Sequence, residues 1–114
     1  LLKRRFKLGV TITGKSGNKY NFEGPYSNPG SLEDRSGVYA ILCEENGKLY
    51  LIDVGESSEV RTRVETHDRK ACWERNCSGI IKYAAYYIEY GKKPSRVEVE
   101  QDIRDNYNIP CGEK

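Results

Sequence analysis

Arg63 and His67 are residues whose types and spacing suit chemistry on a phosphate. In a helix, residues four apart lie one above the other on the same face. An arginine can bind a phosphate, and a histidine can move a proton near neutral pH. The simpler alternative is that both are solvated surface residues, as polar side chains on helices commonly are.

Asp53 is a carboxylate in an apolar stretch, between an isoleucine and a valine. A buried carboxylate without a partner costs several kcal/mol. We therefore expect Asp53 to be partly solvated at the mouth of a cleft, close to Arg63 or to a metal ion.

Two β-hairpins and one further strand must position these residues. Apolar residues alternate with polar ones or glycine in the first hairpin, within residues 1–26, and two apolar runs flank a glycine-containing turn in the second. A later segment rich in β-branched and aromatic residues predicts a third core strand. The predicted strands are residues 6–13, 20–22, 38–43, 49–54 and 80–90, with Phe6, Leu8, Val10 and Ile12 as the first alternating set.

The turn of the second hairpin decides whether Tyr39 and Asp53 share a face. A three-residue loop at 45–47 would pair the two, whereas a two-residue turn would place them on opposite faces. We expect the three-residue loop.

A first helix is predicted directly after this hairpin. Ser57 or Ser58 can cap it, and the pattern extends to about Asn76. Arg63 and His67 would lie on this helix.

A final helix is predicted from a capping box formed by Ser95 and Glu98. It carries Glu100 and cannot include Pro110. Glu100 is a candidate functional acid, although its spacing of four residues from Arg104 also fits a surface ion pair.

The composition bounds the class of protein. The 114 residues suffice for one domain with its own core. With 19 basic and 17 acidic residues, the net charge is +2, which indicates neither disorder nor a strongly basic nucleic-acid binder. No apolar run approaches the roughly 18 residues of a membrane span. We expect a cytoplasmic protein with no membrane contact.

Four cysteines, at positions 43, 72, 77 and 111, lack the short spacings typical of metal ligands. Without a secretory signal, we expect them to be reduced. A zinc site of His67, Cys72 and Cys77 is a weaker alternative, because the usual ligand pairs are missing.

Taken in order, five features over residues 36–112 resemble the GIY-YIG nuclease family. A Gly-Xaa-Tyr motif precedes a second motif that ends in glycine, and an arginine, a histidine and a late glutamate follow at suitable spacing. The matching residues are Gly37, Val38, Tyr39, Asp53, Val54, Gly55, Arg63, His67 and Glu100.

The resemblance implies an α/β (α+β) domain with a small three-stranded antiparallel central sheet flanked by helices. Residues 1–26 would add a β-hairpin to this domain of residues 36–112. It also implies a metal-dependent endonuclease that hydrolyses DNA phosphodiester bonds with Mg²⁺ or Mn²⁺. Specificity would come from an additional DNA-binding domain or from a partner chain.

The resemblance also implies a role for each matching side chain. Tyr39 would activate or orient the attacking water, directly or with His67. Arg63 would contact the scissile phosphate, and Glu100 would bind the metal ion. A base, a cation and a metal ion are together what phosphodiester hydrolysis needs.

Two positions depart from the family pattern. Asp53 stands where the second motif normally has tyrosine, and no asparagine follows Pro110. Asp53 could be a second metal ligand, the base itself, or the mark of a site without turnover. The alternative functions are a catalytically inactive nucleic-acid-binding or interaction module and a purely structural domain.

Overall fold

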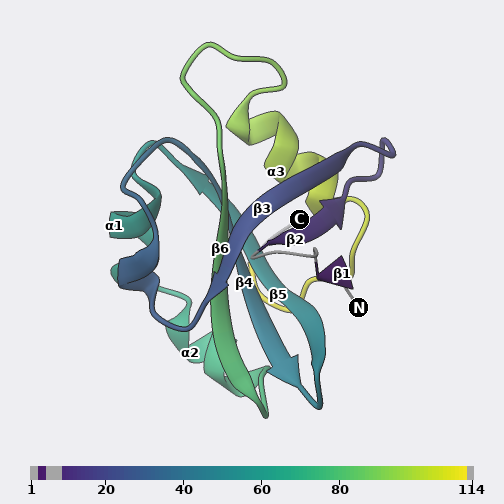
Figure 1. The fold of residues 1–114 in the computed structure, drawn as a ribbon, viewed down its shortest axis with the longest axis vertical. Coiled ribbons are helices and arrows are strands. Elements are labelled where there is room, and N and C mark those ends of the chain that lie inside the picture. Colours follow the sequence, from purple (N-terminus) through teal and green to yellow (C-terminus); the bar gives the residue numbers. More distant parts are fainter. Residues whose placement is uncertain (1–2, 5–8, 113–114) are drawn as a thin grey trace.

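A six-stranded antiparallel sheet dominates the computed structural model over the residues that it describes, 3–4 and 9–112 (Figure 1). The strand order is β1-β2-β3-β6-β4-β5. The strands are β1 (Lys3–Arg4), β2 (Val10–Thr13), β3 (Lys19–Tyr26), β4 (Gly37–Glu45), β5 (Lys48–Ser57) and β6 (Ile80–Tyr87). The helices are short: η1 (Pro29–Ser31, a 3-10 turn), α1 (Val60–Glu65), α2 (Lys70–Arg75) and α3 (Arg96–Arg104).

The predicted three-stranded central sheet with a separate N-terminal hairpin is wrong. β3 pairs with β6, with Glu23 opposite Ala85, so the hairpin extends the same sheet and the chain is mostly sheet. β4 pairs with one edge of β6, and β3 pairs with the other edge, whose backbone groups would otherwise lack partners. Phe6 and Leu8 of the predicted hairpin lie outside the described residues.

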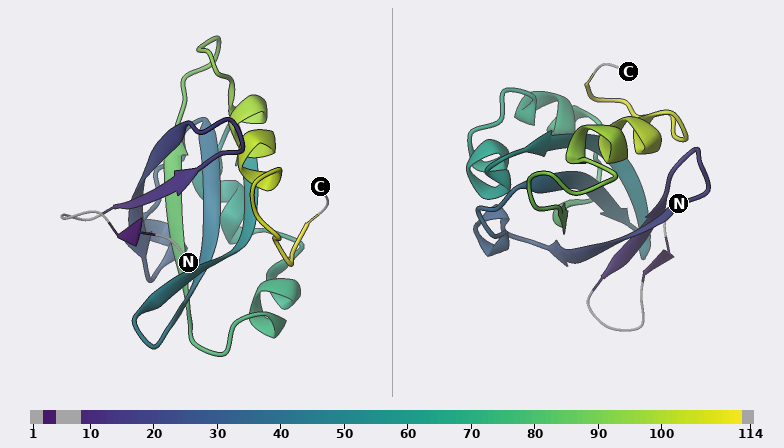
Figure 2. Two further views of the ribbon diagram at one scale, coloured as in Figure 1. Left: turned by 90° about the vertical axis from the view of Figure 1, so that its right-hand side faces the viewer. Right: turned by 90° about the horizontal axis from the view of Figure 1, so that it is seen from above.

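The two faces of the sheet carry separate apolar cores. On one face, Val99 and Ile103 of α3 pack with apolar residues of β2 to β6. On the other, α1 and α2 contribute Val60, Val64 and Trp73. Figure 2 shows the N-terminal hairpin curling toward α3. Tyr39 belongs to the core on the α1–α2 face, whereas Glu100 lies on α3, which covers the opposite face.

The β4–β5 turn has two residues, Asn46 and Gly47, and both have positive φ, as the favoured hairpin turns require. The three-residue loop is therefore wrong. A β-bulge at Ile52 then shifts the pairing of β4 and β5 by one residue, because Ile41 pairs with Asp53 whereas the next residue of β4 pairs with Leu51. Asp53 consequently does share the face of Tyr39, for a reason that turn chemistry alone does not provide.

The expected continuous first helix is also wrong, since α1 ends at Glu65 and α2 begins at Lys70. The ring of His67 accepts the backbone N–H of Arg69 (3.0 Å), a donor that a continuous helix would direct to the carbonyl of Glu65. Neither serine caps α1, whose cap is Glu59. The capping box of Ser95 at the start of α3 is confirmed.

All four cysteines form disulfides, so the expectation of reduced thiols is wrong. Cys43 pairs with Cys77, and Cys72 pairs with Cys111, at Cα–Cα distances of 5.5 and 6.0 Å. The partners are 34 and 39 residues apart, and only the tertiary fold brings them together. Among the described residues, no helix has the length and apolar character to cross a membrane.

Candidate active site

Tyr39 and His67 form a buried hydrogen-bonded pair. The Tyr39 hydroxyl lies 2.7 Å from Nε2 of His67. Tyr39 is 2% exposed and the His67 side chain is fully buried. Because Nδ1 accepts the backbone N–H of Arg69, we assign the ring proton to Nε2, which donates it to the tyrosine oxygen. The hydroxyl proton of Tyr39 is then available for another acceptor.

Burial keeps both members of this pair uncharged near neutral pH. It lowers the pKa of His67 to about 4, and the positive charges of Arg63 and Arg69 act in the same direction. Burial, followed by the negative charge of Asp53, raises the pKa of Tyr39 to about 12. Tyr39 is therefore a hydrogen-bond donor at neutral pH and not a phenolate base.

The motif glycines make room for this arrangement. Gly55 lies opposite Tyr39 in the β4–β5 ladder, and a Cβ at position 55 would overlap the Tyr39 hydroxyl. Gly37 approaches the β6 backbone in the same way. Val38 and Val54 face the other side and belong to the apolar core. A packing requirement therefore explains these motif positions.

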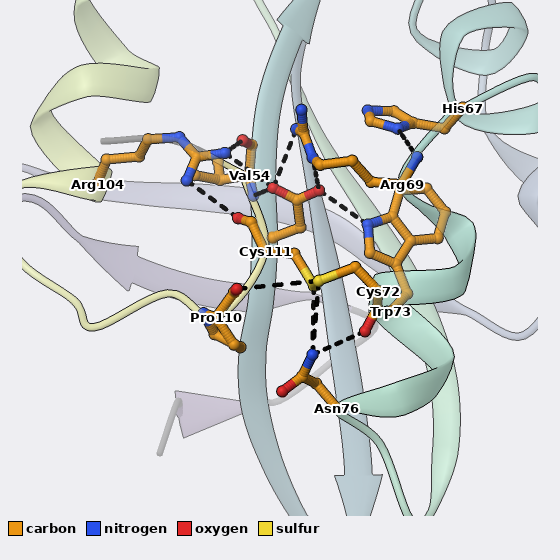
Figure 3. Close-up of a disulfide and its surroundings, with 10 residues drawn as sticks. Val54, His67, Arg69, Cys72, Trp73, Asn76, Arg104, Pro110 and Cys111 are labelled. Atoms are coloured by element: carbon orange, nitrogen blue, oxygen red, sulfur yellow. Dashed lines mark hydrogen bonds and ion pairs between the residues drawn. A yellow bond between two sulfur atoms is a disulfide. The ribbon is translucent and has the colours of Figure 1, made fainter.

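Asp53 is fully buried and accepts five hydrogen bonds. Arg69 donates to both oxygens, with Nε 2.8 Å from Oδ2 and Nη2 3.2 Å from Oδ1. Nη2 of Arg104 lies 2.8 Å from Oδ1, and the indole of Trp73 lies 2.8 Å from Oδ2. In Figure 3, Arg69 and Trp73 approach from one side and Arg104 from the other.

The predicted solvated position of Asp53 near Arg63 or a metal ion is therefore wrong. Its charged partners are Arg69 and Arg104, and five donors occupy the lone pairs that a metal would need. Sequence reasoning missed both arginines. A carboxylate within an apolar strand predicts that some cation lies beside it. Which of the many basic residues this is depends on the tertiary fold, so the sequence alone could not identify it.

Arg63 and Glu100 lie on helices that cover opposite faces of the sheet, α1 and α3. Arg63 is partly exposed and pairs with Asp68 (3.1 Å). The Glu100 side chain, 25% exposed, lies 3.3 Å from Nε of Arg104, and burial raises its pKa. The charge of Arg63 lowers the pKa of Tyr39, and that of Glu100 raises it. Of the four predicted catalytic residues, Tyr39 and His67 are joined by a hydrogen bond, whereas Arg63 pairs with Asp68 and Glu100 pairs with Arg104.

Glu100 has the chemistry to hold a divalent ion. Mg²⁺ keeps several waters and is commonly held by one or two carboxylates together with substrate phosphates, so one partly exposed carboxylate fits it. Cys43, Glu45 and Cys77 also lie together, but both sulfurs are in a disulfide. The alternative zinc site is wrong, because its two cysteines belong to different disulfides.

No family model, curated protein or solved structure matches this chain.

We expect the neutral state of His67 to make stability depend on pH. The folded pKa of about 4 lies below the ordinary value of 6.5, so the unfolded chain binds more protons between these values. The free energy of unfolding should therefore be highest above pH 6.5 and fall toward pH 4, by roughly 3 kcal/mol at most from this residue. Urea denaturation across this range measures the effect.

His67→Gln is the control, because glutamine does not titrate. His67 is the only histidine of the chain, so the variant should lose most of the pH dependence between 4 and 6.5. Parallel stability curves for the two proteins would contradict the neutral assignment.

Proposed function

We propose that this chain is a GIY-YIG-type metal-dependent endonuclease domain that hydrolyses DNA phosphodiester bonds. The observation that supports the proposal best is the buried hydrogen bond between Tyr39 and His67, and the charges of Arg63 and Glu100 both affect the pKa of Tyr39. A hydroxyl donor, a cation and a carboxylate for a metal are what such a reaction requires.

Each residue has a role in this proposal. His67 holds the Tyr39 oxygen, and the free hydroxyl proton of Tyr39 orients the attacking water or a phosphate oxygen. Arg63 exchanges Asp68 for the scissile phosphate and stabilises its developing negative charge. Glu100 binds Mg²⁺ or Mn²⁺. The bound ion would supply a Lewis acid for the phosphate and a more acidic water.

The alternative is a catalytically inactive nucleic-acid-binding or interaction module. The burial of Tyr39 and His67 favours it, because the substrate must reach a hydroxyl that little solvent reaches. The presence of Asp53 in the second motif does not favour this alternative. Its carboxylate lies beneath the surface, so it cannot repel a phosphate directly.

DNA is the proposed partner, and an additional DNA-binding domain or a partner chain would supply specificity. The net charge of +2 is small for a protein that binds DNA unaided. The sequence alone predicts a cytoplasmic location. Two disulfides favour an oxidising compartment instead.

We expect Arg63→Ala to lower plasmid cleavage in Mg²⁺ by at least about 100-fold, because it removes a charge that faces the phosphate. Arg61→Ala is the matched control, since two residues on a helix are about 200° apart and Arg61 faces elsewhere. It should retain activity within a few-fold. Equal losses would indicate a diffuse basic patch instead, and no cleavage by the unmodified protein would favour the inactive module.

A further inference from the structure

Arg69 presents an anchored guanidinium beside the Tyr39–His67 pair. Its Nε and Nη2 are both committed to Asp53. Nη1 makes no hydrogen bond within the described part of the chain, and the side chain is 30% exposed. The guanidinium is therefore fixed at one edge and has donors left for a ligand at the other.

The charge of Arg69 reaches the groups of the candidate active site. It lowers the pKa of Tyr39, of His67 and of Glu100. Its backbone N–H also fixes the ring of His67. Arg69 thus belongs to the same site as the residues predicted from the sequence.

The carboxylate of Asp53 does not face an incoming anion. Asp53 is fully buried, so a ligand that approaches from solvent meets the arginine first. Arg63, by contrast, pairs with the exposed Asp68 and must leave this partner to bind a phosphate. A donor that is already fixed loses less conformational freedom on binding.

We propose that Arg69 is a second phosphate-contacting residue, whose Nη1 donates to a phosphate oxygen of the substrate while Asp53 positions it. This proposal extends the function proposed above. It also gives Asp53 a reason to stand in the second motif, because an aspartate there can hold an arginine that a tyrosine could not hold through two charge-assisted bonds.

Inorganic phosphate, titrated into the unmodified protein without metal, tests the proposal. Side-chain NMR resonances of Arg69 should shift saturably, and chloride at equal ionic strength should not reproduce the shift. Arg69→Gln should weaken phosphate binding about tenfold, the loss of one charge-assisted hydrogen bond. Arg75→Gln, which removes the same charge from an exposed position of α2, should change binding less than twofold.

If Arg69→Gln does not fold, the resonance shifts of Arg69 in the unmodified protein decide the test alone. Unmoved Arg69 resonances would overturn the proposal, whether or not the protein cleaves DNA. Saturable shifts at Arg69 would support it even if plasmid cleavage fails, in which case only the endonuclease proposal is lost.

Discussion

Asp53→Asn is expected to lower the free energy of unfolding by about 3–5 kcal/mol. The carboxylate is fully buried and accepts bonds from Arg69 and Arg104. Asparagine keeps the shape but has no charge, and its amide nitrogen donates hydrogen bonds and cannot accept those that one carboxylate oxygen of Asp53 receives. Arg104, 5% exposed, would be left with a buried charge that Glu100 alone cannot balance. Urea denaturation followed by the fluorescence of Trp73, the only tryptophan, measures the loss.

Asp68→Asn is the matched control for this substitution. Asp68 also pairs with an arginine, but its side chain is 77% exposed, and exposed ion pairs contribute about 0–1 kcal/mol. A loss below about 1 kcal/mol for Asp53→Asn would show that Asp53 is not the buried centre of this network.

The local elements of the fold could be predicted from the sequence. Ser95 and Glu98 are three residues apart and form the predicted capping box. The second hairpin and the strand at residue 80 follow from short-range patterns in the same way. Such signals involve neighbouring residues, so they do not depend on the tertiary fold.

The position of Asp53 could not be predicted, because it depends on distant contacts. Arg69 is 16 residues away and Arg104 is 51 residues away. The bulge at Ile52 that turns the side chain to the face of Tyr39 has no glycine or other local signal. The disulfides likewise join cysteines that only the sheet topology brings together.

The candidate site was predicted in part. The resemblance to the GIY-YIG family implies that Tyr39 acts directly or with His67, and the two side chains form a hydrogen bond. The predicted helical spacing of Arg63 and His67 does not place the histidine beside Tyr39, because α1 ends before His67. The imidazole is buried against Tyr39 and Trp73, in the segment between α1 and α2.

Glu100→Gln is expected to abolish metal-dependent cleavage, with a loss of at least about 100-fold. Glutamine keeps the size of the side chain but is a poor ligand for Mg²⁺, which prefers charged oxygen. The ion pair with Arg104 is also lost, but Arg104 keeps Asp53 as a partner. The fold should therefore remain intact, which circular dichroism and urea denaturation can verify.

The most direct test is the Mg²⁺ dependence of plasmid cleavage by the unmodified protein, Glu100→Gln and Glu74→Gln. Glu74 lies exposed on α2 and controls for the change of charge. We predict that the unmodified protein and Glu74→Gln cleave DNA in Mg²⁺ or Mn²⁺ but not in EDTA, and that folded Glu100→Gln does not cleave at any metal concentration. Cleavage by Glu100→Gln at the unmodified rate, or no cleavage by any of the three proteins, would contradict a metal-dependent nuclease site at Tyr39 and Glu100.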